Sequence, residues 1–361
     1  MKKYLYQLAT DQSNSPLDQI LKFFLWMLSL IYGLAVFVVK SMTRVTHLPK
    51  PVISVGNLTM GGVGKTPLVE FIAEYILLNP NFANAKSGLK QLKPAILTRG
   101  YIPSALQSKM SESDEVAMLK KKFPQVPIVA GPNRAQRAQD FLKENAADIF
   151  ILDDGFQQWG LFRNLNILTV DATNPWGNGH LIPRGILREP LSSIKQADII
   201  VLTKTDLGRK NMAALKQVIR NFNASVPIVE AVHKPVKFTD PLSEQTFDLS
   251  FIKNQKICFF CGIGDPLSLE EMLKNLGAHV AKSFIFEDHH VYSAQEISVI
   301  HEYCQRQAIG IIVTTDKDAV KLKNLLSGQD KRITFLSLNI VLSIVEGKEV
   351  LFERINSLSR H

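Results

Sequence analysis

Short apolar runs alternate with helix-length stretches along much of the chain. The first run is Val52-Ile53-Ser54-Val55, and turn residues follow it directly. A short apolar run bounded by turn signals is typical of a strand buried on both faces. Strands that alternate with helices predict a mostly parallel, doubly wound α/β sheet, with ligands bound beyond the carboxyl ends of the strands. The predicted strands are residues 52–55, 94–97, 127–129, 149–152, 166–170 and 198–202.

A second, smaller α/β series follows the first. It contains predicted strands at 257–260 and 311–314 and predicted helices at 267–276 and 294–306. Between the two series the pattern becomes short and polar, which is typical of a linker. The length of the chain suits two domains and an appendage. The predicted parts are an N-terminal helix at 1–44, a larger domain at 45–229, a linker at 230–250 and a smaller C-terminal α/β domain at 251–361.

Residues 23–39 form a run of seventeen positions without a charge, bracketed by Lys22 and Lys40. As a helix this run is about 25 Å long, slightly short of a hydrocarbon core of about 30 Å. Because the run is apolar on all sides rather than amphipathic, it favours a membrane-inserting helix over a buried core helix, which is the alternative. No small-x-small cleavage site follows, which disfavours a signal peptide. Whether the helix spans the bilayer or enters one leaflet stays open.

The charge balance indicates an anionic partner. The 361 residues include 42 Lys and Arg against 33 Asp and Glu, a formal net charge of +9. No Lys/Arg run carries interleaved aromatic residues, so we expect no nucleic-acid partner and favour a phosphorylated substrate or an anionic membrane. Lys40, Arg44 and Lys50 follow the apolar run, which fits the cytoplasmic leaflet. The three cysteines form no disulfide framework and fit a reducing cytosol, and Cys258 and Cys261 are predicted to be buried thiols.

A glycine-rich loop follows the first strand and precedes a predicted helix. Strand, glycine loop and helix are the order that a phosphate-binding loop (P-loop) requires, and the alternative is a glycine turn with a chance Gly-Lys-Thr. Lys65 is predicted to reach the β- and γ-phosphates of ATP, and the Thr66 hydroxyl to hold Mg²⁺. Thr59 stands where the usual motif has its first glycine. The predicted ATP-binding residues are Thr59, Met60, Gly61, Gly62, Val63, Gly64, Lys65 and Thr66.

Asp153 and Asp154 come directly after the strand 149–152. An acidic residue at the end of an apolar strand is the usual partner of a P-loop and holds Mg²⁺ opposite the Thr66 hydroxyl. The alternative for either aspartate is a cap of the next helix. We therefore predict a magnesium site formed by Thr66, Asp153 and Asp154.

Three classes of P-loop protein compete at this point. A nucleotide-switch ATPase is disfavoured because Met60 stands where such proteins carry a lysine. A GTPase is disfavoured because Thr203 replaces the asparagine of the guanine-reading Asn-Lys-x-Asp motif. The third class is a membrane-bound small-molecule kinase, which needs an acceptor pocket and a base.

Several further short motifs occur in one order along the chain, at residues 54–59, 98–101, 113–115, 153–157, 177–179, 187–190 and 288–290. Together they resemble the tetraacyldisaccharide 4'-kinase family of the lipid A pathway, and the resemblance is most specific over residues 153–190. It implies an inner-membrane P-loop kinase with two α/β/α domains and an N-terminal membrane helix. It also implies that ATP and Mg²⁺ are used to phosphorylate the 4'-hydroxyl of a lipid disaccharide 1-phosphate, an anionic glycolipid. The motifs are Asp153-Asp154-Gly155-Phe156-Gln157, Leu187-Arg188-Glu189-Pro190 and Asp288-His289-His290.

The resemblance further implies that Asp114 receives the acceptor proton and that His289 is its partner. Judged from the residues alone, Asp114 precedes an apolar-periodic stretch and also looks like a helix cap, and His289 also suits a surface loop. Polar residues at strand ends and in loops are candidates for binding phosphate, although any single arginine is by default a surface charge. These candidates are Asn57, Arg99, Arg134, Arg184 and Arg188. The segment Asp316-Lys317-Asp318 resembles a family segment, and we assign it no role.

Overall fold

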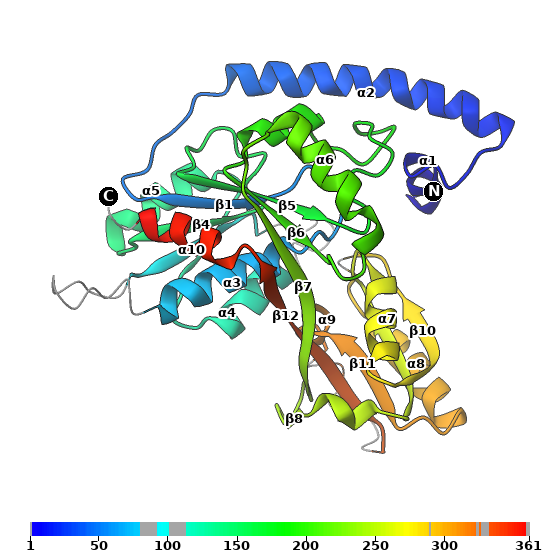
Figure 1. Cartoon of the computed structure of the whole chain (residues 1–361). Coiled ribbons are helices and arrows are strands. Elements are labelled where there is room, and N and C mark those ends of the chain that lie inside the picture. The colour runs from blue at the N-terminus through cyan, green and yellow to red at the C-terminus, as the bar shows by residue number, and fades with distance from the viewer. Residues whose placement is uncertain are drawn as a thin grey trace. The chain divides into compact units, whose positions relative to one another are not determined.

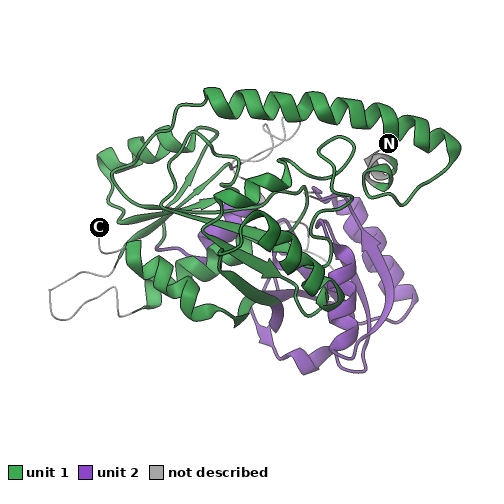
Figure 2. Ribbon diagram, turned by 45° about the horizontal axis from the view of Figure 1, so that its top comes forward, with its two compact units in different colours: residues 1–99, 126–232, 342–361 green, residues 100–125, 233–341 purple. Residues whose placement is uncertain are grey.

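The computed structural model describes residues 2–79, 92–100, 113–288, 290–322, 325 and 332–358. The chain divides into two compact units (Figure 2). Unit 1 contains residues 1–99, 126–232 and 342–361, and unit 2 contains residues 100–125 and 233–341.

Neighbouring strands in the sheet of unit 1 pair in parallel. Its strand order is β7-β6-β5-β1-β4-β2-β3 (Figure 1). The first strand along the chain, β1, lies between β4 and β5, so the strand order reverses beside it, and ligands bind at such switch points in open α/β sheets. The strands are β1 (Val52–Gly56), β2 (Pro94–Thr98), β3 (Ile128–Ala130), β4 (Ile149–Asp153), β5 (Leu165–Asp171), β6 (Ile199–Thr203) and β7 (Ile228–Thr239).

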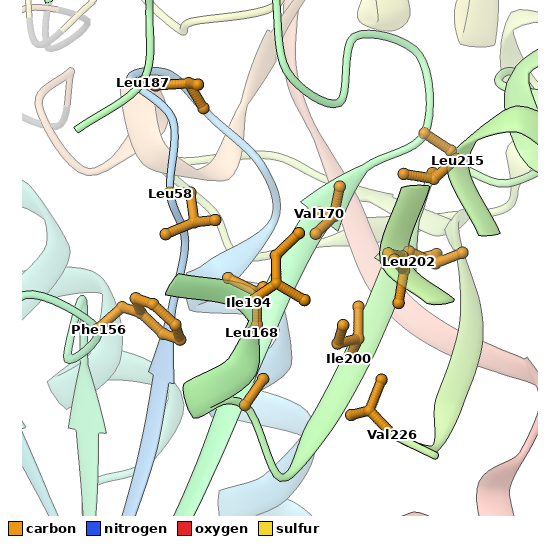
Figure 3. Close-up of a cluster of buried hydrophobic side chains, with 13 residues drawn as sticks. Leu58, Phe156, Leu168, Val170, Leu187, Ile194, Ile200, Leu202, Leu215 and Val226 are labelled. Atoms are coloured by element: carbon orange, nitrogen blue, oxygen red, sulfur yellow. The ribbon is translucent and has the colours of Figure 1, made fainter. Parts of the chain in front are cut away.

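Helices cover both faces of this sheet. In β1 the positions 52 and 56 are four residues apart and therefore face the same way. Val52 pairs in register with Phe150 and Gly56 with Leu168, so the side chains of Val52, Phe150 and Leu168 point to one face of the sheet. On that face α6 (Met212–Phe222) and the 3₁₀ helix Leu191–Gln196 pack over the β5 and β6 side, around Leu168, Ile200 and Leu202 (Figure 3). The helix α5 (Arg134–Glu144) packs over β4 and β2. The helix α3 (Lys65–Leu78) contacts β1, β2 and β4, and Tyr75 on it stacks on Phe352 of α10 (Lys348–Ser357) with ring centroids 3.7 Å apart.

Unit 2 repeats this layering around a smaller parallel sheet. Its strand order is β10-β9-β11-β12. One face packs on Leu269 and Leu273 of α7, and the other packs on Ile297 and Ile300 of α8. The elements are α4 (Asp114–Lys122), β8 (Thr246–Phe247), β9 (Lys256–Cys261), α7 (Pro266–Asn275), β10 (His279–Ile285), α8 (Ala294–Arg306), β11 (Ile311–Thr315), α9 (Asp316–Ala319) and β12 (Thr334–Glu346).

The predicted α/β class and the predicted strands are confirmed, and Cys258 and Cys261 are buried as expected. The stretch 230–250 differs from the expected linker. Residues up to Thr239 belong to the long strand β7, and the boundary between the units falls inside it, after residue 232. Its second half is mostly exposed or half-buried and includes Pro235, a residue that is uncommon inside strands, so the sequence there does not look like a strand. Both units are also discontinuous in sequence. Residues 100–125 belong to unit 2, although they lie between two segments of unit 1, and the final residues, 342–361, belong to unit 1.

The apolar N-terminal run forms the long helix α2 (Pro16–Met42), preceded by α1 (Lys2–Ala9). Ser15 and Asp18 form a capping box with Pro16 in the first turn, which explains why the helix begins well before the apolar run. By length and composition this helix suffices to cross a membrane, and it is the one such helix among the described residues. Figure 1 shows α2 running along unit 1.

Candidate active site

The P-loop lies between the end of β1 and the start of α3, as predicted. Gly64 caps α3 with φ of 83°, a left-handed conformation that favours glycine. At Gly56 an added Cβ would lie 2.4 Å from the backbone nitrogen of Phe156, so only glycine allows this close approach of the two segments. At Gly61 and Gly62 an added Cβ would meet nothing within 4 Å, so this side of the loop is open. The loop leads into the amino end of α3, where unpaired backbone N–H groups favour an anion.

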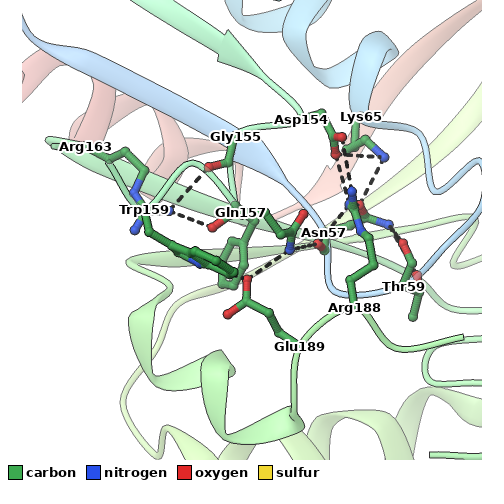
Figure 4. A network of polar contacts seen from close by, with 11 residues as sticks. Asn57, Thr59, Lys65, Asp154, Gly155, Gln157, Trp159, Arg163, Arg188 and Glu189 are labelled. Atoms are coloured by element: carbon green, nitrogen blue, oxygen red, sulfur yellow. Dashed lines mark hydrogen bonds and ion pairs between the residues drawn. The ribbon is translucent and has the colours of Figure 1, made fainter. Parts of the chain in front are cut away.

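Four polar side chains converge at this loop (Figure 4). Lys65 Nζ lies 3.0 Å from Asn57 Oδ1 and 3.4 Å from Asp154 Oδ1. The Arg188 guanidinium donates two hydrogen bonds to Asp154, of 2.9 and 3.1 Å, and also donates to Asn57 Oδ1. Burial by itself would raise the pKa of Asp154, but Lys65 and Arg188 outweigh it and hold that pKa well below its usual range. Asp154 is therefore a carboxylate at neutral pH, facing two cations.

Asp153 lies beside the start of the P-loop. It ends β4 and pairs in register with Val55 of β1, and it is buried. Asp154 follows with φ of 51°, which turns the chain sharply after the strand. Asp153 and Asp154 thus lie at the carboxyl end of β4, next to the carboxyl end of β1, which leads into the P-loop.

Arg188 belongs to a segment, residues 181–189, that we call the strap. The strap lies against the P-loop, because Met60 N donates to Ile186 O at 2.7 Å and Arg188 N donates to Leu58 O at 2.6 Å. The Nε of Arg188 is buried and has no hydrogen-bond partner within the described part of the chain. A buried donor of this kind fits an anionic ligand.

Glu189 is a site residue that the sequence analysis did not single out. Its side chain is fully buried although it carries a carboxyl group. Its carboxylate accepts hydrogen bonds from Gln157 Nε2 at 3.0 Å, Trp159 Nε1 at 3.2 Å, Ser193 Oγ at 2.9 Å and Lys40 Nζ at 2.9 Å. In the sequence, Glu189 could have been noticed only because it follows Arg188 in the motif Leu187-Arg188-Glu189-Pro190. The pattern of neighbouring residues does not reveal that its carboxyl group is buried.

The remaining arginine candidates separate into three environments. Arg134 is buried at the start of α5, where burial lowers its pKa and the carboxylates of Asp154 and Asp153 oppose that shift. Its Nε also has no hydrogen-bond partner among the described residues, so it remains a phosphate candidate. Arg99 is exposed at the end of β2. Arg184 instead binds the N-terminal segment, donating to Leu8 O at 3.1 Å and to Asp11 at 2.8 Å.

The predicted proton acceptor and its partner belong to unit 2. The N-cap of α4 is Ser113, whose Oγ accepts a hydrogen bond from Val116 N, and Asp114 is the first helical residue. The capping role that competed for Asp114 is therefore filled by its neighbour. His289 lies outside the described residues. His290 Nε2 lies 3.0 Å from Glu296 Oε1 and its ring stacks on Phe286.

The segment Asp316-Lys317-Asp318 connects these two parts of unit 2. Lys317 Nζ lies 2.9 Å from Asp288 Oδ1 and 3.8 Å from Glu115 Oε1. Lys321 Nζ donates to His290 O at 3.0 Å. Lys317 thus contacts both Asp288 and the first turn of α4, and Lys321 contacts the backbone of His290.

Thr203 and Lys204, which were compared with the guanine-reading motif, both contact other parts of unit 1. Thr203 Oγ1 donates to Val63 O at 2.8 Å, and Lys204 Nζ pairs with Asp171 at 2.5 Å in a buried ion pair. Both side chains therefore support the P-loop and the end of β5, while Asp206 is exposed.

Comparison with known proteins identifies the family of the chain. Residues 21–359 match the family described as Tetraacyldisaccharide-1-P 4'-kinase. A tetraacyldisaccharide 4'-kinase of Halothermothrix orenii is 32% identical over 370 residues, covering 95% of this chain and 94% of the relative. Another, of Syntrophus aciditrophicus, is 34% identical over 338 residues and covers 86% of each chain. The crystal structure of LpxK from Aquifex aeolicus in complex with ATP is 28% identical, with a TM-score of 0.69, covering 94% of this chain and 99% of that one. The sequence resemblance is confirmed, and the chain belongs to the tetraacyldisaccharide-1-phosphate 4'-kinase family.

Proposed function

We propose that the protein transfers the γ-phosphoryl group of ATP to the 4'-hydroxyl of a tetraacyldisaccharide 1-phosphate, giving the 4'-phosphorylated lipid A precursor. The observation that carries this proposal is the convergence of Lys65 and Arg188 at an open P-loop. Two cations and the helix amino end neutralise charge on the transferring group, which is the main requirement of phosphoryl transfer. Arg134 is a further candidate for the same charge.

The residues present fit a bound Mg²⁺ ion. Thr66, Asp153 and Asp154 offer only oxygen donors, which is the ligand type that Mg²⁺ prefers. They lie on adjacent elements, since β4 pairs with β1 and α3 contacts both strands. When bound, the ion would neutralise charge on the β- and γ-phosphates.

For the acceptor, we propose that Asp114 takes the proton of the 4'-hydroxyl and that His289 orients or relays it. A sugar hydroxyl is a poor nucleophile, so a positioned carboxylate aids its attack. Support comes from Ser113, which caps α4 and leaves Asp114 without that task. Further support comes from Lys317, which lies close to carboxylates beside both positions, Glu115 and Asp288.

A phosphate-transfer assay tests this function directly. Purified protein in detergent receives ATP labelled at the γ-phosphate, Mg²⁺ and tetraacyldisaccharide 1-phosphate, and the lipid and aqueous products are separated. We expect label in the lipid, with little release of free phosphate. Release of phosphate without labelled lipid would instead favour the alternative, a membrane-associated nucleotide switch.

Arg188 and Arg184 offer a matched pair on one segment. We expect Arg188→Met to lower kcat by about a hundredfold, because a cation beside the transferring phosphate is lost. Arg184→Met should change kcat by less than about threefold and mainly lower Tm, because this guanidinium binds Asp11 and Leu8 O. Steady-state kinetics and thermal unfolding of both variants check this. Equal kinetic losses would contradict the separate roles.

We also propose that α2 lies in the inner membrane at its cytoplasmic face, along its surface rather than across it. Lys40, near one end of the apolar run, binds Glu189, and Lys22, near the other end, binds Asp11, which Arg184 also binds. The axial distance between these lysines is about 27 Å, close to a hydrocarbon thickness, so a spanning helix would pull the unit into the bilayer. The outward side instead exposes large apolar residues: Phe23, Phe24, Leu30, Ile31, Leu34 and Phe37.

Charges on this outward side should release the protein from membranes. We expect Ile31→Asp combined with Leu34→Asp to reduce sedimentation with anionic vesicles by at least about tenfold, since two apolar contacts are replaced by charges repelled from the lipid. The Tm should change little, because both side chains are about two-thirds exposed. Unchanged sedimentation would mean that another surface holds the protein at the membrane.

A further inference from the structure

The inward side of α2 carries several polar side chains beside apolar ones such as Leu25, although the helix as a whole is apolar. The residues that face unit 1 include Lys22, Ser29, Tyr32 and Lys40, whose spacing places them along one side of a helix. Gly33 lies in the same stripe, and an added Cβ there would lie 2.8 Å from Leu181 Cδ1. A helix used only as an anchor needs no polar stripe toward its own protein. The stripe therefore indicates a second task.

Three residues of this stripe hold the strap. Ser29 Oγ donates to Leu181 O at 2.8 Å and accepts from Arg184 N at 3.0 Å. Tyr32 Oη donates to the backbone oxygen of Arg188 at 3.1 Å. Lys40 Nζ lies 2.9 Å from Glu189 Oε2. The helix thus contacts the strap at its start, and again at its last two residues, Arg188 and Glu189.

The other side of the strap is bonded to the P-loop. Thr59 and Leu187 form an antiparallel bridge, flanked by the hydrogen bonds from Met60 N to Ile186 O and from Arg188 N to Leu58 O. A displacement of the strap would therefore move both the Arg188 guanidinium and the backbone that surrounds the phosphates.

The buried carboxyl group of Glu189 joins the strap to α2 through an ion pair. A fully buried carboxylate requires a counter-charge and filled hydrogen-bond positions, and Lys40 of α2 supplies the ion pair. The same carboxylate orients Gln157, whose Nε2 also donates to Asn57 O at 3.0 Å. Asn57 Oδ1 in turn accepts from Lys65. A continuous series of contacts therefore runs from Lys40 of α2 to the P-loop lysine. Figure 4 shows its part from Glu189 to Lys65.

We propose that α2 is a positioning element of the phosphate site: Lys40 and Tyr32 hold the strap so that Arg188 and the P-loop bind ATP, and insertion of α2 into lipid strengthens ATP binding. Lipid favours the docked helix because it covers the exposed apolar side while the polar stripe faces the protein. Because coupling between two binding events is reciprocal, ATP should strengthen vesicle binding by the same factor. The inference rests on the proposed role of the P-loop in binding ATP.

The primary experiment measures nucleotide binding without acceptor. The Kd of a fluorescent, non-hydrolysable ATP analogue is determined for full-length protein with and without anionic phosphatidylglycerol vesicles. For the unaltered protein we expect vesicles to lower this Kd by about fivefold, within the usual range of coupling between sites. Lys40→Met should raise the Kd with vesicles by about tenfold and lower kcat, while KM for the lipid acceptor stays within about twofold.

Conservative variants separate positioning from loss of fold. Lys40→Arg keeps the charge and should restore most of the affinity, and Tyr32→Phe, which loses one hydroxyl, should weaken the analogue by about threefold. In the Glu189→Gln background a neutral amide replaces the carboxylate, so adding Lys40→Met should change the Kd by less than about twofold. If Lys40→Met fails to fold, Tyr32→Phe still decides the matter.

The variant carrying Ile31→Asp and Leu34→Asp is the matched control on the outward side of the same helix. It should lose the effect of vesicles on the Kd while keeping the Kd of the unaltered protein measured without vesicles. The proposal is overturned if Lys40→Met and Tyr32→Phe bind the analogue as tightly as the unaltered protein, or if vesicles leave its Kd unchanged. Absence of phosphate transfer to lipid would contradict the proposed function and not this inference, since the readout is nucleotide binding.

Discussion

Replacing Lys65 with methionine is expected to lower kcat by about a thousandfold, which is the effect of removing a cation from a transferring phosphoryl group. In the structure its ammonium lies between Asn57 Oδ1 and Asp154 Oδ1, at the amino end of α3. Lys65→Arg should not restore the rate, because the loop is shaped for a compact ammonium and the guanidinium is a planar fork. Initial rates of phosphate transfer at saturating ATP and acceptor measure the effect.

Lys143 provides the control for this substitution. It is an exposed lysine of α5 in the same unit, paired with Asp140 at 2.7 Å, away from the P-loop. Lys143→Met should leave kcat unchanged and shift Tm only slightly. If Lys65→Met kept more than about a tenth of the rate, the phosphate-binding role of this loop would be wrong.

Replacing Asp114 with asparagine is expected to lower kcat by two to three orders of magnitude, roughly the contribution of a general base. Binding of ATP and the Tm should stay nearly unchanged, because Ser113 and not Asp114 caps the helix. His289→Ala should cost less, and the double variant should be little worse than Asp114→Asn if the two residues act as one unit. Rates, nucleotide affinity and thermal unfolding are measured for each variant.

Ser113→Ala is the matched control at the adjacent position. It removes the side-chain acceptor of the Val116 N–H and should destabilise the fold by about 1 kcal/mol while leaving kcat intact. The two neighbours thus give opposite results, one losing rate and the other losing stability. A near-normal kcat for Asp114→Asn would remove this residue from the mechanism.

Local signals explain why much of the fold was predictable. A buried parallel strand is a short apolar run, and the runs at 52–55 and 149–152 became β1 and β4. The P-loop was predictable because its glycines, lysine and threonine are contiguous and its flanking strand and helix are both visible in the sequence. Where the signal was mixed, as in β7, the prediction of a linker missed a strand whose second half is only partly covered.

The sequence by itself determined the α/β class, the P-loop after the strand β1, and the two aspartates, Asp153 and Asp154, at the end of β4. It also determined a long apolar helix near the amino end. Only the tertiary structure decided which polar groups act together. Lys40 and Glu189 form an ion pair although they are 149 residues apart, and Arg184 turned away from the P-loop toward Asp11 while Arg188, in the same strap, turned toward it. The reason is physical: strand and loop signals arise from neighbours in sequence, whereas the partner of a buried charge is chosen by which chain segments the fold packs against it.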